Sequence, residues 1–222
     1  MTRTMFFTLL SIVLAQGAMA AQKPHTVSFG KWTTVKWFAD QEETTPLDLK
    51  VRPLFVDGKL KEYTLGMPHE VTERLLVVRR AFQLNDSLPD DKAPRWRWER
   101  GGWLLVDRAA GRVTQVLLPE FDTYYSVVSW YRDYAAYCGL SEDGEKSFLV
   151  VMQLGRRRPV LRRATAITVA EGEPDSACPS PDWQRQPVRV TFTTRQEKST
   201  YQVRGHAVDL LREPDNDDAG AN

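Results

Sequence analysis

The sequence predicts an all-β fold of antiparallel strands. Apolar and polar residues alternate in many short runs, which is typical of strands with one buried face. Glycine-containing turns separate these runs at short intervals. No long amphipathic helical pattern follows the N-terminal apolar segment. Because strands joined by tight turns pair antiparallel, we expect an antiparallel meander.

The first predicted element is a hairpin over residues 47–66, which read LDLKVRPLFVDGKLKEYTLG. Two alternating runs flank Asp57 and Gly58, and these residue types tolerate the positive φ that a two-residue turn requires. Residues 71–82 indicate the next strand, although their imperfect alternation leaves a helix open. Residues 85–94 contain acids, Ser and two prolines and predict a loop.

Residues 95–118 (RWRWERGGWLLVDRAAGRVTQVLL) predict three strands, with turns at 100–102 and 109–111. In the first of these strands, alternation places Trp96 and Trp98 on one face. Further runs and turns follow in the C-terminal half. We expect strands within 124–161 separated by turns at 142–144 and Gly155, a turn-rich loop over 164–187, and a hairpin of 188–194 with 200–206.

Two segments share one layout. Aligning Gly111 with Gly155 superposes 104–117 on 148–161 at an offset of 44 residues, and each reads strand, turn Gly, Arg, strand. Periods of about 40–45 residues with four strands each are typical of β-propeller blades. Residues 102–162 resemble blades of TolB-like and other WD40-type β-propellers, through LLVDRAAGR (104–112) and SEDGEK (141–146).

This resemblance implies blade-like sheets in a small or incomplete β-propeller, a scaffold that usually binds partners. It implies no functional residue. About 200 residues follow the N-terminal apolar segment, and they are enough for at most four blades, the lower limit for propellers. A β-sandwich or barrel therefore stays open as the alternative architecture.

The first twenty residues have the three parts of a cleavable signal peptide. Arg3 supplies the positive charge, an apolar run follows it, and Ala18 and Ala20 are the small residues that a signal peptidase requires. We expect cleavage between Ala20 and Ala21, and hence a periplasmic or secreted protein. Residues 21–211 are predicted to form a single domain, and the acidic 212–222 a disordered tail.

Loss of Arg3 with the signal leaves 29 basic against 29 acidic side chains, a balance that argues against a nucleic-acid partner. No other segment is long and apolar enough to predict a membrane span. Cys138 and Cys178 are the two cysteines of the chain. An even count in an exported protein predicts a disulfide, whereas a redox or metal pair would favour C-x-x-C spacing.

Catalytic and metal-binding motifs are absent from the sequence, and we predict no cofactor. The three histidines lie far apart, and no G-x-S-x-G motif is present. Carboxylates near predicted strand ends leave a glycosidase-like pair open. The four acids concerned are Asp107, Glu120, Asp122 and Asp133.

Aromatic and basic residues give the candidate binding surface. Trp96 and Trp98 alternate with arginines, and that face is either an exposed platform or ordinary core. Arg156, Arg157 and Arg158, together with Arg162 and Arg163, bracket a predicted hairpin turn. This basic cluster forms either an anion-binding surface or a solvated edge that prevents aggregation.

The sequence as a whole favours an exported, non-enzymatic interaction domain of the bacterial envelope that binds a protein or glycan. The alternative hypothesis is a small extracellular glycan hydrolase that uses paired carboxylates.

Overall fold

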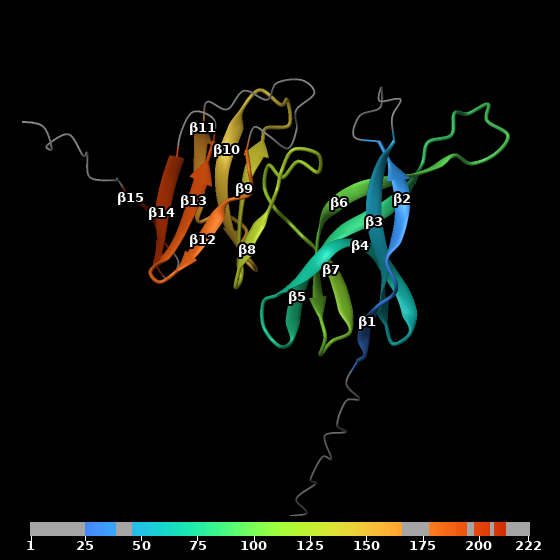
Figure 1. Cartoon of the computed structure of the whole chain (residues 1–222), viewed down its shortest axis with the longest axis horizontal. Coiled ribbons are helices and arrows are strands. Elements are labelled where there is room, and N and C mark those ends of the chain that lie inside the picture. The colour runs from blue at the N-terminus through green and yellow to red at the C-terminus, as the bar shows by residue number, and fades with distance from the viewer. Residues whose placement is uncertain (1–24, 39–45, 166–177, 195–197, 205–206, 212–222) are drawn as a thin grey trace, which may run out of the picture.

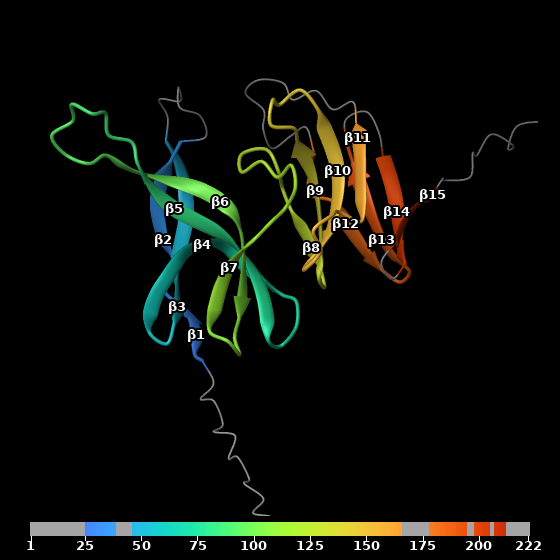
Figure 2. The same ribbon diagram turned by 180° about the vertical axis from the view of Figure 1, so that it is seen from behind.

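The computed structural model describes residues 25–38, 46–165, 178–194, 198–204 and 207–211. These residues contain no helix and form strands in three sheets, which confirms the predicted all-β class. Two units lie side by side, a barrel and a sandwich, as the two opposite views show (Figures 1 and 2). None of the described residues forms an apolar helix of membrane-spanning length. The predicted signal peptide and acidic tail lie outside the described residues.

The first unit is a small barrel of strands β2 to β6. The chain order β2-β3-β4-β5-β6 pairs antiparallel, and a parallel contact of β2 with β6 at Trp37 and Trp98 closes the ring. Two short strands extend it, because β1 pairs with β3 and β7 with β6. The strands are β1 (Val27–Phe29), β2 (Thr33–Trp37), β3 (Leu47–Val56), β4 (Lys59–Glu70), β5 (Leu75–Asn85), β6 (Trp96–Asp107) and β7 (Arg112–Val116).

The barrel encloses apolar side chains along its whole length. The predicted hairpin of β3 and β4 is confirmed, with φ of 51° at Asp57 and 73° at Gly58. Alternation along the strands turns every second residue inward. The buried inward residues form two clusters, Leu54, Leu76, Val78, Leu104 and Val106 at one end and Val51, Leu65 and Ala81 at the other.

Two sequence-based predictions in this unit can be compared with the structure. The strand predicted within 71–82 is confirmed as β5, which begins at Leu75, and the helix left open there does not form. The predicted turn at 100–102 is wrong, because β6 runs through it as one strand. A β-bulge lies there instead: Arg79 pairs with Trp103 and Ala81 with Arg100, so β6 carries one extra residue. Consecutive glycines fit a bulge as well as a turn.

The second unit is a sandwich of two four-stranded antiparallel sheets, ordered β11-β10-β9-β8 and β12-β13-β14-β15. The turns at Gly144 and Gly155 and the hairpin of β13 with β14 are confirmed. Strand β12 lies within the predicted loop 164–187, and β15 was not predicted. The strands are β8 (Ser129–Tyr131), β9 (Tyr134–Leu140), β10 (Ser147–Gln153), β11 (Leu161–Thr165), β12 (Asp182–Arg185), β13 (Val188–Thr193), β14 (Lys198–Arg204) and β15 (Ala207–Leu211).

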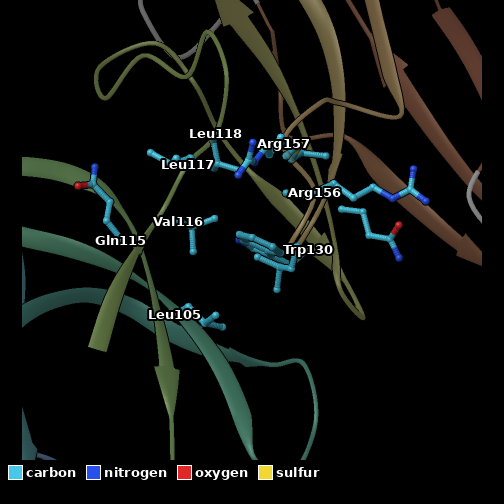
Figure 3. Close-up of a pocket in the computed structure, with 13 residues that line it drawn as sticks. Leu105, Gln115, Val116, Leu117, Leu118, Trp130, Arg156 and Arg157 are labelled. Atoms are coloured by element: carbon cyan, nitrogen blue, oxygen red, sulfur yellow. The ribbon is translucent and has the colours of Figure 1, made fainter. Parts of the chain in front are cut away.

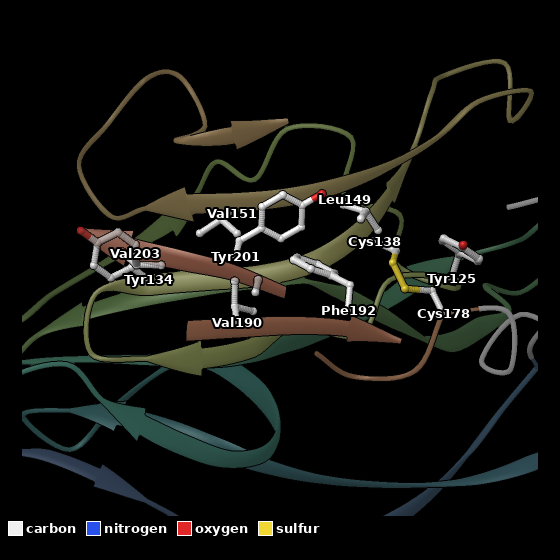
Figure 4. Packing of buried hydrophobic residues seen from close by; sticks show 11 residues of the cluster. Tyr125, Tyr134, Cys138, Leu149, Val151, Cys178, Val190, Phe192, Tyr201 and Val203 are labelled. Atoms are coloured by element: carbon white, nitrogen blue, oxygen red, sulfur yellow. A yellow bond between two sulfur atoms is a disulfide. The ribbon is translucent and has the colours of Figure 1, made fainter. Parts of the chain in front are cut away.

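The sandwich core lies between its two sheets (Figure 4). Leu149 and Val151 of β10 face Phe192 of β13, and all three side chains are buried. The predicted disulfide is present: Cys138 and Cys178 are bonded at the edge of this core, with Cα atoms 6.2 Å apart. The bridge therefore ties β9 to the segment that precedes β12.

The two segments with propeller-like layout fall in different units. The first, 104–117, forms the β6–β7 hairpin of the barrel, and the second, 148–161, forms β10 and the start of β11 in the sandwich. The described residues thus form both a barrel and a sandwich, whereas the sequence left open one or the other as the alternative to a propeller. Segments 104–117 and 148–161 share a layout because each is an antiparallel hairpin with a positive-φ glycine in its turn.

Residues 117–128 connect the units and pack against both. The Arg100 guanidinium donates to the carbonyl oxygens of Thr123 and Tyr124, each at 3.0 Å. On the sandwich side, the Leu140 N–H donates to the Glu120 carbonyl oxygen at 2.8 Å. The connecting segment therefore fixes one unit against the other.

Candidate functional site

A groove lies where the barrel meets the sandwich, and Figure 3 shows one part of it. It consists of two adjoining cavities of about 300 and 660 Å³. Leu105, Leu154 and Gly155 line both cavities, so the two are neighbours. Small-molecule sites typically measure about 300–1,000 Å³, which places the groove in the range of ligand pockets.

The lining of the groove is mostly apolar. Leu105 and Val116 come from the barrel and Trp130 from the sandwich (Figure 3). Met152 of β10 in the sandwich also lines the groove. Leu117 follows β7 at the edge of the groove and is 80% exposed. Leu117 thus adds an exposed apolar side chain to the apolar walls of the groove.

Trp130 is held in place by the barrel. Its ring meets that of Trp103 edge-on, with centroids 5.3 Å apart, and stacks on His69 at 6.0 Å. The Nε2 atom of His69 lies 2.8 Å from the Arg132 carbonyl oxygen. These contacts make the indole a fixed wall between the two units, and the shape of the groove depends on them.

Two of the predicted binding arginines, Arg156 and Arg157, line the groove, whereas Arg158 does not. All three are exposed, and none forms an ion pair with another residue in the described part of the chain. Arg156 and Arg157 line the first cavity together with Leu117 and Leu118, and Figure 3 labels all four side chains. The groove is therefore apolar at its floor and positively charged at its rim.

The two predicted tryptophans lie elsewhere. Trp96 is 60% exposed at the start of β6, and Trp98 packs edge-on against Tyr63 with ring centroids 5.0 Å apart, next to the barrel core. Neither lines the groove. The structure thus separates the predicted aromatic residues from the predicted basic ones.

The sequence reasoning missed Leu117, Trp130 and Met152. Only Leu117 gave a usable signal, because Leu117 and Leu118 are apolar residues that lie beyond the end of a strand and directly before Pro119. Trp130 and Met152 are ordinary strand residues by pattern. Their place in the groove depends on how the two units pack.

A third cavity, of about 410 Å³, lies on the outer face of β5 and β6 and has a different character. Glu99 is only 5% exposed there, lies 2.7 Å from the Arg97 Nε, and accepts a hydrogen bond from the Tyr124 hydroxyl at 2.7 Å. Burial, reinforced by this hydrogen bond to Glu99, raises the pKa of Tyr124 to about 12. Since the buried carboxylate already has its partners, this cluster fixes the connecting segment.

The four acids considered for catalysis all have structural partners. Asp107 forms an ion pair with Arg74, and the hydrogen bond from Arg74 holds the Asp107 pKa well below its usual range. The other three bond as follows: Glu120 with Arg162 at 2.6 Å, Asp122 with the backbone N–H of Tyr124 at 2.8 Å, and Asp133 with Gln153 at 2.8 Å. These contacts orient turns and strand ends.

Metal ligands do not gather in the described part of the chain, where no three His, Cys, Asp or Glu side chains form a cluster. His25 bonds Asp57 at 2.7 Å, His69 lies in the wall described above, and His206 lies outside the described residues.

No protein-family model matches this chain, and neither a curated protein nor a solved structure matches it. Its function is therefore inferred from the groove.

Proposed function

We propose that this chain is an exported, non-enzymatic binding protein of the bacterial envelope, and that the groove between barrel and sandwich is its binding site. One observation carries the proposal: Leu117 is 80% exposed beside an apolar cavity whose rim bears Arg157. Exposing a leucine to water is unfavourable by about 1.5–3 kcal/mol relative to burying it. A ligand that covers Leu117 recovers that free energy.

The contacts of the acids favour binding over hydrolysis. A glycosidase needs one free carboxyl group as acid and a second as base or nucleophile. Asp133, the one carboxylate that lines the groove, accepts a hydrogen bond from Gln153 at 2.8 Å. The earlier expectation of a protein or glycan partner stays a prediction, and the apolar floor favours a ligand with an apolar part.

Export is supported by the signal-peptide pattern of residues 1–20 and by the Cys138–Cys178 disulfide, a bond that persists in oxidising compartments. We expect N-terminal sequencing of the protein recovered from periplasm or medium to begin at Ala21. Recovery of the protein only from the cytoplasm, with Met1 retained, would contradict export.

Binding in the groove is testable with anilinonaphthalene sulfonate, an apolar aromatic probe that carries one negative charge. We expect the full chain to bind one probe molecule with a rise in fluorescence. Leu117→Glu should lower the affinity for the probe about tenfold or more, because it replaces an apolar contact with a carboxylate that repels the negatively charged probe. Leu88→Glu is the matched control, since Leu88 is 66% exposed in the loop between β5 and β6, away from the groove.

The outcome that contradicts the proposal is equal probe binding by the two variants and the unmodified chain. Turnover of any member of a glycan panel by the unmodified chain would instead support the hydrolase alternative.

A further inference from the structure

We propose that the ligand of this groove is a long-chain fatty acid, with its acyl chain along the apolar floor and its carboxylate on Arg157. The inference rests on the proposed function, because it names the ligand of the same site. It follows from the apolar side chains that line both cavities, from the hydrogen bonds that several polar groups beside them already form, and from the exposed arginine that lines the first cavity together with Leu117 and Leu118.

Apolar side chains line both cavities. Val116 and Leu118 line the first, Leu75 lines the second, and Leu105 and Leu154 line both. An unbranched acyl chain can contact side chains of this kind along its length. Every methylene that leaves water contributes about 0.8 kcal/mol in general, so a longer chain binds more tightly.

Several polar groups near the groove already have partners. The backbone N–H of Leu154 donates to the Asp133 carbonyl oxygen at 2.8 Å, and that of Arg156 to the Gln153 carbonyl oxygen at 3.1 Å. The Gln153 amide donates to the Asp133 carboxylate. A peptide or a glycan in the groove would lose hydrogen bonds to water and find few here, and each unpaired polar group is unfavourable. An acyl chain has no such groups.

Arg157 supplies a cation at the rim of the groove. Arg157 is exposed, lines the first cavity together with Leu117 and Leu118, and forms no ion pair with a described residue (Figure 3). A guanidinium binds a carboxylate through two parallel hydrogen bonds. Arg156 also lines this cavity and Arg132 lines the adjoining one, so an anionic headgroup on Arg157 has further cations near it.

The test is displacement of bound anilinonaphthalene sulfonate from the full chain by twelve-carbon amphiphiles, each kept below its micelle concentration. We expect dodecanoate to displace the probe, dodecanol to bind about tenfold more weakly, and dodecyltrimethylammonium to bind more weakly still. Decanoate should bind about fourfold more weakly for each methylene that it lacks.

Two variants locate the headgroup. Arg157→Gln should weaken dodecanoate about tenfold and leave dodecanol unchanged, because it removes only the charged contact. Arg158→Gln is the matched control: Arg158 is equally exposed and adjacent in sequence, but it does not line the groove. Circular dichroism of both variants checks that they fold.

The possible failures are distinguishable. If the probe binds but dodecanoate does not displace it, the fatty-acid inference is wrong and the proposed binding function stands. If dodecyl phosphate or an acidic peptide binds more tightly than dodecanoate, the ligand class is wrong. If the probe itself does not bind, the proposed function falls as well.

Discussion

At the scale of single residues, a few buried polar side chains join the connecting segment to the barrel. Glu99 is 5% exposed, and Arg97 and the Tyr124 hydroxyl both contact its carboxylate. A buried carboxylate without such partners would be strongly destabilising. Arg79 and Arg100 add hydrogen bonds to the Thr123 carbonyl oxygen. This cluster holds the segment whose first residues form the edge of the groove.

Tyr124 gives a measurable consequence of that burial. Its folded pKa of about 12 lies above the ordinary value near 10, so between these values the folded chain keeps a proton that the unfolded chain loses. The contribution of Tyr124 to stability is therefore complete below pH 10 and is lost as the pH rises towards 12.

We expect a spectrophotometric titration of Tyr124→Phe to lack one phenol that ionises near pH 12 in the unmodified chain. If Tyr124→Phe instead lacks a phenol that ionises near pH 10 in the unmodified chain, Tyr124 is not buried against Glu99.

At the scale of elements, the connecting segment lies flat on β9 because Gly139 has no side chain. A Cβ atom at Gly139 would lie 2.6 Å from the Glu120 carbonyl oxygen, closer than atoms in contact can come. Gly102 in β6 differs, since its Cβ would have no neighbour nearer than 3.8 Å, at Gln115. Similar glycines in two strands thus meet different surroundings.

Gly139→Ala should therefore destabilise the chain by about 1–3 kcal/mol, as overpacking typically does. Gly102→Ala, the matched control, should change stability little. Denaturant unfolding of the two variants measures both effects. Equal free energies of unfolding would indicate that the connecting segment does not pack on β9 in this way.

Elements joined by local turns were the predictable part of the fold. Asp57 and Gly58 specify their hairpin through backbone conformations that few other residues adopt, and Gly155 does the same for its turn. Gly101 and Gly102 led to the wrong prediction of a turn, because the backbone freedom of glycine also suits a bulge inside a strand. Strand β12 was missed in a segment whose prolines suggested only loop.

At the scale of the whole molecule, the proposed binding site is the groove between barrel and sandwich, which neither unit forms alone. Leu105 belongs to the barrel and Met152 to the sandwich, and the packing of the units brings them to one groove. The closing contact of Trp37 with Trp98 likewise joins strands about sixty residues apart in sequence. Such contacts leave no local pattern in the sequence, so the groove could not be predicted from it. Arg156 and Arg157 were predicted as binding residues, but the apolar residues that line the groove with them were not.

Methyl nuclear magnetic resonance of the full chain, titrated with anilinonaphthalene sulfonate, tests the central claim most directly, because it locates the bound probe. We predict that the methyl signals of Leu105, Leu117, Leu118 and Met152 shift together with one affinity, while those of Leu47 and Leu60 on the barrel do not move. Shifts confined to Leu47 and Leu60, or no saturable shift at the four groove residues, would contradict the assignment of the groove as the binding site.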